Sequence, residues 1–272
     1  MQDTSGRPAA PLVDSHLHLD DRRFDTDRDA VLARAREAGV SAMVVPATCR
    51  AGWASIAELA SRHRDVYPAY GLHPVFLAAH RGGDAEALAR WLDDHAAVAV
   101  GEIGLDFHDA ALDPQEQRRL FARQLAIAQE RRLPVIIHAR RAVEAVIMEL
   151  RRHPVLRGVV HSYGGSIEQA RQLWGHGFLI GLGGPLSHAR AQRLHRLVAA
   201  MPLDQLLLES DAPDQPGAEH RGERNEPAWL PLTRDHVARW RDEDPDAIAR
   251  ATSINAERLF GLSRWTEAAG QA

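Results

Sequence analysis

Short apolar runs rich in Val, Ile and Leu alternate eight times with longer amphipathic stretches rich in Ala, Arg, Glu and Leu. Near-continuous apolar runs are typical of strands that are buried on both faces, as in parallel sheets covered by helices. Eight such units in succession predict an α/β fold, a (β/α)8 TIM-type barrel, with an open doubly wound sheet as the alternative. The expected strands are residues 12–18, 40–47, 66–73, 97–106, 134–139, 158–162, 178–184 and 206–213.

Helix-start signals fall between these runs. Asp113 is followed by Pro114 and, at the third helical position, by Glu116, which is a capping-box arrangement. Ser166 and Gln169 repeat the spacing before a later amphipathic stretch. These signals place helices between consecutive strands, as a barrel requires.

The pattern predicts one domain over residues 12–262, with flexible tails at residues 1–11 and 263–272. No linker-like or low-complexity tract interrupts the domain. The first residues lack the basic and apolar regions of a signal peptide, and no apolar run approaches the ~18 residues of a membrane span. We therefore expect a cytoplasmic protein that does not enter a membrane.

Composition excludes several kinds of chemistry. The chain has no lysine, so neither a lysine Schiff base nor a modified lysine bridging two metals can form. Its single cysteine, Cys49, excludes a thiolate metal cluster and an intrachain disulfide. The net charge of −4 does not indicate a broad basic surface for duplex DNA.

Polar residues stand at the ends of the apolar runs, where a buried polar group is costly unless something satisfies it. The carboxyl ends of parallel barrel strands meet at one face, which is the active-site face of TIM barrels. A lone histidine in such a run is more often a hydrogen-bonded core residue, but the repeated placement predicts convergence. The residues are His16, His18, His73, Glu102, His138, His161 and Asp211.

Imidazole and carboxylate ligands without sulfur suit a divalent metal, with zinc foremost and manganese, magnesium, iron or cobalt as alternatives. Without His73, six candidate ligands remain, which exceeds the needs of one catalytic metal. Two metals sharing a carboxylate, about 3.5–4 Å apart, fit the number better. Glu102 is the natural bridge because no lysine is available.

Several motifs then resemble one family. "DSHLHLD", "GLHP", "GEIGLDF", "PVIIHAR", "HSYGGS", "ESDAP" and "RNEP" resemble, in order, the signatures of TatD-like metal-dependent hydrolases, or deoxyribonucleases, of the amidohydrolase superfamily. The resemblance implies a two-metal barrel that hydrolyses phosphodiesters with a metal-activated hydroxide, often as a 3′→5′ exonuclease on single strands. It places one metal on His16, His18, Glu102 and Asp211, and the other on Glu102, His138 and His161.

The resemblance and the positions of the residues suggest further roles. Asp211 is expected to orient the hydroxide and take its proton, and His73 to contact the substrate phosphate or the leaving oxygen. Asp14 and Glu209 are expected to hydrogen-bond ligand histidines from behind. Arg140 and Asn225 are weaker candidates for contact with a substrate anion.

Two other functions remain open at this stage. The first is hydrolysis of an amide, a lactone or another small molecule, as in other members of the superfamily. The second is a metal-stabilised interaction protein without turnover. The expected partner of the hydrolase is the end of a single-stranded DNA or a small phosphoester, and no obligate protein partner is evident.

Overall fold

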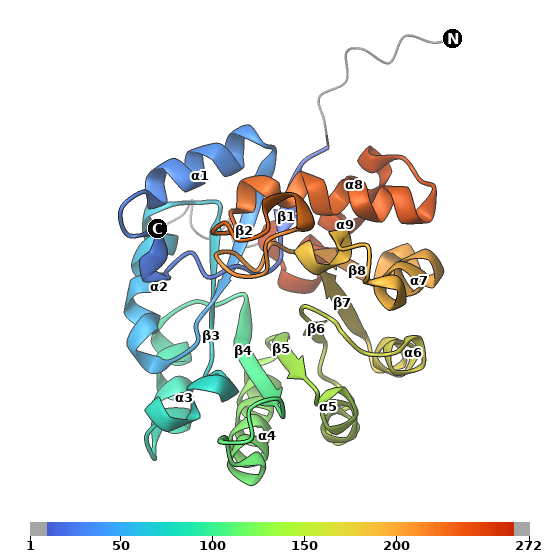
Figure 1. The fold of residues 1–272 in the computed structure, drawn as a ribbon. Helices are drawn as coiled ribbons and strands as arrows, with labels where there is room; N and C mark the ends of the chain where they lie inside the picture. Colours follow the sequence, from blue (N-terminus) through green and yellow to red (C-terminus); the bar gives the residue numbers. More distant parts are fainter. Residues whose placement is uncertain (1–9, 264–272) are drawn as a thin grey trace, which may run out of the picture.

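Eight parallel strands follow one another in chain order around a single sheet, and helices surround them (Figure 1). The computed structural model describes residues 10–263. Consecutive strands are paired from β1 to β8, and a backbone hydrogen bond of 3.0 Å from Ser15 to Leu208 joins the last strand to the first. The sheet is thus a nearly closed barrel, which confirms the predicted fold over the open sheet.

The strands are shorter than the apolar runs that predicted them. Several end before the polar residues of interest, because the chain leaves the regular ladder to form the loops at the carboxyl face. The strands are β1 (Leu12–Asp14), β2 (Val40–Pro46), β3 (Val66–Tyr70), β4 (Ala99–Asp106), β5 (Val135–Arg140), β6 (Gly158–Val160), β7 (Phe178–Leu182) and β8 (Leu206–Leu208).

The predicted helix starts are present. The Asp113 side chain accepts the Gln115 N–H at the start of α4, and Ser166 and Gln169 form a reciprocal capping box at the start of α6. The helices are α1 (Arg28–Glu37), α2 (Trp53–Arg62), α3 (Asp84–Asp94), α4 (Pro114–Arg131), α5 (Val143–Leu150), α6 (Ile167–Gly175), α7 (Gln192–Ala200), α8 (Leu230–Arg241) and α9 (Pro245–Phe260).

Short 3-10 segments occupy the loops, among them η1 (Arg22–Phe24) after β1 and η3 (Pro74–Ala79) after β3. Within residues 10–263 no helix is long and apolar enough to cross a membrane. Most of the two predicted tails, residues 1–11 and 263–272, lies outside the described residues.

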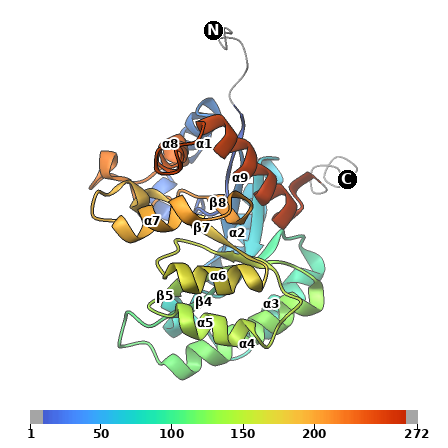
Figure 2. The same ribbon diagram turned by 90° about the vertical axis from the view of Figure 1, so that its right-hand side faces the viewer.

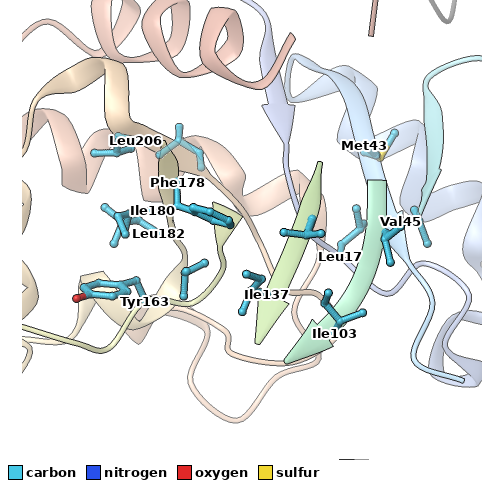
Figure 3. Packing of buried hydrophobic residues seen from close by; sticks show 14 of the residues in the cluster. Leu17, Met43, Val45, Ile103, Ile137, Tyr163, Phe178, Ile180, Leu182 and Leu206 are labelled. Carbon is cyan, nitrogen blue, oxygen red and sulfur yellow. The ribbon is translucent and has the colours of Figure 1, made fainter. Parts of the chain in front are cut away.

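Two apolar clusters build the core. The larger one fills the space between strands and helices and includes Met43, Ile103 and Phe178 (Figure 3). The smaller one gathers residues from around the barrel, such as Val44 and Ile136, with residues of α9. α9 packs against β1 and β8 (Figure 2). The barrel interior is therefore apolar, and the charged residues described below are confined to its carboxyl face.

Candidate metal centre

The loops that follow β1 and β8 lie side by side and bring three of the predicted ligands together. His16, His18 and Asp211 all fall beyond the ends of these strands. The backbone N–H of Asp211 donates to the carbonyl of His16 at 2.9 Å, and that of His18 donates to Ala212 at 2.7 Å. The two histidines therefore converge because the two loops are paired, and not because they alternate along a strand as expected.

Glu102 reaches the same place because β4 departs from regular pairing. The register of β4 with β5 shifts between Val100 and Ile103, so a β-bulge lies at Glu102. On the other side, a Cβ added to Gly71 would lie 2.7 Å from the backbone carbonyl carbon of Gly101. A glycine at position 71 thus lets the loop after β3 pack directly against the backbone that carries Glu102.

One oxygen of Glu102 faces His16, His18 and Asp211. Glu102 Oε2 lies 3.3 Å from His16 Nε2 and 3.4 Å from His18 Nε2. Asp211 Oδ1 lies 3.4 and 3.7 Å from the same two nitrogens, which are 3.3 Å apart. Tetrahedral zinc bonds of about 2.0–2.1 Å place neighbouring ligand atoms about 3.3–3.4 Å apart. The four atoms therefore have a spacing close to that of such a site.

The other oxygen of Glu102 faces a second group of histidines. Glu102 Oε1 lies 2.7 Å from His161 Nε2 and 3.2 Å from His138 Nδ1, and these two nitrogens are 3.4 Å apart. His73 Nε2 lies 2.9 Å from the same oxygen. Glu102 thus presents one oxygen to each group of ligand atoms.

The surroundings of Glu102 test whether a cation fits. The residue is 1% exposed, and neither of its oxygens receives a well-directed hydrogen bond from the described residues. An isolated buried carboxylate in this condition would be strongly unfavourable. Imidazole nitrogens that crowd a carboxylate without donating to it are expected where all these atoms point at a shared cation. The donor set, nitrogen and carboxylate oxygen, therefore fits divalent metal.

Asp106 is a site residue that the sequence reasoning missed. Its Oδ2 lies 2.9 Å from His138 Nε2. The Gln117 side chain anchors its backbone, because it accepts the Asp106 N–H at 2.7 Å and donates to the Asp106 carbonyl at 2.8 Å. With Nε2 bound to Asp106, His138 directs Nδ1 towards Glu102. The available signal was its position at the end of an apolar run, four residues after Glu102.

Replacing Asp106 with alanine is expected to weaken zinc binding about 10- to 100-fold, because His138 loses the partner that orients its ring. Competition between the protein and a chromogenic chelator would measure the affinity. Asp109→Ala is the matched control, since Asp109 lies in the loop that follows β4 and its side chain accepts the Ala111 N–H. Unchanged affinity in Asp106→Ala would show that Asp106 does not orient a ligand.

The two carboxylates expected to support histidine rings make other contacts. Asp14 Oδ1 accepts the backbone N–H groups of Ser210 at 3.0 Å and of His16 at 3.3 Å. Glu209 Oε1 accepts the backbone N–H of Ser162 and lies 3.8 Å from His161 Nδ1, beyond hydrogen-bond distance. Both carboxylates therefore secure the loop backbones, and neither makes the predicted bond to a ring.

Burial and mutual charge shape the electrostatics of the centre. Burial would raise the pKa of Glu102, but the adjacent imidazoles, His73 foremost, hold that pKa well below its usual range. Burial would lower the pKa of His161, but the charge of Glu102 raises it to about 10. Burial raises the pKa of Glu209 to about 8 and that of Asp14 to about 7. The cluster therefore favours positive charge, whether as a proton or as a metal cation.

Left-handed backbone is concentrated around the centre. Arg141, Ser162, Asp211 and Gln215 have φ of 54°, 43°, 55° and 51°, and all four line the cleft described below. Such residues cost about 1–3 kcal/mol each and persist where contacts impose them. Here the Gln215 amide donates to Asp211 Oδ2, and the Ser162 hydroxyl donates to Gln215 Oε1 at 2.8 Å. These contacts leave Asp211 Oδ1 facing the histidines.

A cleft of about 1060 Å³ opens above the metal centre. This exceeds the volume of most small-molecule pockets, so the cleft has room for more than a compact ligand. Arg140, exposed at the end of β5, lines the cleft as predicted for a residue that meets an anion. Asn225 is placed differently, because it is buried and its amide donates to the carbonyls of Ser210 at 2.6 Å and Asp214 at 2.8 Å.

Known proteins resemble this chain over nearly its whole length. The sequence model of the family described as TatD related DNase matches residues 13–261. The uncharacterized metal-dependent hydrolase YjjV of Escherichia coli K12 is 40% identical over 257 residues, covering 92% of this chain and 98% of that protein. The 3′-5′ ssDNA/RNA exonuclease TatD of Erwinia tasmaniensis is 37% identical over 259 residues, covering 92% of this chain and 100% of that protein.

The fold is likewise shared with solved structures. The crystal structure of the TatD homologue YjjV from Escherichia coli K12 superposes with a TM-score of 0.89 at 37% identity. The alignment covers 92% of this chain and 98% of that one.

Proposed function

Because the chain belongs to the TatD related DNase family of metal-dependent hydrolases, we propose that it removes nucleotides from the 3′ ends of single-stranded DNA. The observation that carries the proposal is the division of Glu102 between two groups of ligands at the floor of a large cleft. Two cations held side by side suit hydrolysis of a phosphodiester, whose attacking and leaving oxygens both need stabilisation. Relatives named as 3′-5′ exonucleases support removal of nucleotides from the 3′ end.

Two sets of residues would hold the metals. His16, His18, Glu102 and Asp211 form the first set, and Glu102, His138 and His161 form the second. Ligand atoms also lie close together across these sets, in the group of His16, Glu102 and His161 and in that of His73, Glu102 and His138. When bound, such cations lower the pKa of a coordinated water and neutralise phosphate oxygens. Zinc fits the nitrogen-rich donors best, with manganese, magnesium, iron or cobalt as alternatives.

We assign to Asp211 the orientation of the attacking water and the acceptance of its proton. Gln215 occupies Asp211 Oδ2, while Oδ1 lies among the histidine nitrogens. Attack forms a bond from the water oxygen to phosphorus and breaks the bond from phosphorus to the leaving oxygen, which then needs a proton. A carboxylate at this position can accept the first proton at neutral pH.

His73 lines the cleft beside Glu102, which supports contact with the phosphate or the leaving oxygen. Its Nδ1 accepts the backbone N–H of Val75 at 3.1 Å, and its Nε2 lies 2.9 Å from Glu102 Oε1. Burial lowers the pKa of His73 to about 4, and the side chain is therefore neutral at pH 7. We assign it to substrate contact, outside both ligand sets.

The metal-loaded protein is expected to shorten a 5′-labelled single-stranded oligonucleotide stepwise from its 3′ end. Chelator should stop the reaction, and a phosphorothioate at the last linkage should slow it. Asp211→Asn, purified in parallel, controls for contaminating nucleases. Hydrolysis of an amide or lactone panel without any cleavage of phosphodiesters would contradict the proposal, and so would metal-bound protein that turns over neither class.

A further inference from the structure

A small apolar patch lies on the wall of the cleft, close to the metal centre. It consists of Val75 and Phe76, which are 42% and 44% exposed and both line the cleft. Both residues belong to η3, which begins directly after His73. Large apolar side chains that face water in a binding cleft offer a surface for an apolar part of a ligand.

Phe76 is separated from Glu102 by a single side chain. Its ring meets that of His73 edge to face, with centroids 5.8 Å apart and planes at 67°. His73 in turn lies 2.9 Å from Glu102. A group attached closely to a phosphate that is bound at the metal centre is therefore within reach of the Phe76 ring.

Two arginines at the end of β5 give the cleft a second feature, a positive charge that suits a negatively charged group of a ligand. Arg140 and Arg141 are exposed, both line the cleft, and neither forms an ion pair within residues 10–263. Arg23, also on the cleft, is by contrast held by Asp21 and Asp214 at 2.8–3.0 Å. The two arginines offer positive charge to an anion, and the patch offers an apolar surface to a flat apolar group.

An unpaired nucleotide combines these two features. Its phosphate suits the metal centre and the arginines, and its base offers a flat face for an aromatic ring. We propose that Phe76, flanked by Val75, is the platform on which a base at the 3′ end of the strand stacks. This inference rests on the proposed function. It also means that a duplex end must fray before it can be cut.

The test compares Phe76→Ala with wild type on two single-stranded substrates. One is an ordinary oligonucleotide, and the other has abasic residues at its last two 3′ positions. On the ordinary strand, Phe76→Ala is expected to lower kcat/KM roughly 5- to 100-fold, since one stacked base contributes about that much. On the abasic strand the two proteins should agree within about twofold. Phe76→Trp should retain activity on the ordinary strand.

A second measurement does not depend on turnover. A 2-aminopurine at the 3′ end of a strand with a phosphorothioate at its last linkage should lose fluorescence on binding to the metal-loaded wild-type protein, because stacking quenches it, and should lose much less with Phe76→Ala. Met148→Ala is the control in both experiments, since Met148 is 56% exposed and lies on α5 outside the cleft.

The outcomes separate the two proposals. If Phe76→Ala lowered kcat/KM equally on both substrates, the stacking platform would be overturned, because a loss that does not depend on a base would come from disturbance of the neighbouring His73. The exonuclease proposal would remain intact. Equal quenching with and without Phe76 would overturn the stacking platform too. Wild-type protein that binds metal but cuts and binds no DNA would overturn the exonuclease proposal and the platform together.

Discussion

Replacing Glu102 with alanine is expected to empty both of the proposed metal sites and to lower hydrolysis at least about 10³-fold. Glu102 supplies one oxygen to each ligand group, so a single substitution removes a ligand from both. Each cation contributes several kcal/mol of charge stabilisation to the transition state, and about 1.4 kcal/mol corresponds to a factor of ten. The rings of His16 and His161 also stack across the two groups, with centroids 3.8 Å apart, but Glu102 is the carboxylate that faces both.

Metal analysis and single-strand digestion, carried out on the same samples, would check this prediction. Glu102→Gln keeps the shape of the side chain and removes its charge, so it separates loss of the bridge from loss of packing. Glu130→Gln is the matched control, because Glu130 is an exposed glutamate near the end of α4, away from the carboxyl face. Full activity of Glu102→Ala with normal metal content would refute the bridging role.

β5 and β6 show which features of the site the hydrophobic pattern alone could predict. Ile136 on β5 and Val159 on β6 belong to the cluster that fills the barrel interior. Side chains two residues apart face the same side, so His138 and His161 face the same interior at the carboxyl ends of these strands. Here alternation and position along the apolar run were enough to predict where the histidines lie.

Glu102 shows where alternation fails. Counted from Ala99, which belongs to the interior cluster, strict alternation would direct Ile103 inward and Glu102 outward. The register shift of β4 reverses this order. Such a bulge depends on packing between neighbouring strands, which the hydrophobic pattern of one strand does not contain. The sequence predicted Glu102 as a site residue from its position at the end of the apolar run, and not from the side of the strand on which alternation would place it.

The loops were the least predictable part of the centre. His16 and His18 converge through the backbone bonds between the loops after β1 and β8, which link residues almost two hundred positions apart. Gln215 fixes the orientation of Asp211, but it has no periodic relation to any strand. Loop conformation follows from such tertiary contacts, and local sequence preference cannot supply it.

Removing the metals is expected to lower the melting temperature by about 5–10 °C, in addition to abolishing activity. A ligand that binds only the folded state stabilises it by about 2.7 kcal/mol at one hundred times its Kd. For a domain of this size, each kcal/mol shifts the melting temperature by about 2–4 °C. Without cations, the buried Glu102 is left among histidine rings that do not donate well-directed hydrogen bonds to it.

Calorimetry of the metal-loaded, chelated and zinc-restored protein would measure the shift, with free chelator dialysed away before each scan. Glu102→Ala provides the internal control, because a protein that cannot hold the cations should melt at the same temperature before and after chelation. A chelator effect on that variant would instead reveal metal bound elsewhere. An unchanged melting temperature in wild type that has lost all its metal would mean that the histidines and Glu102 satisfy one another without a cation, contrary to the geometry of their nitrogen and oxygen atoms.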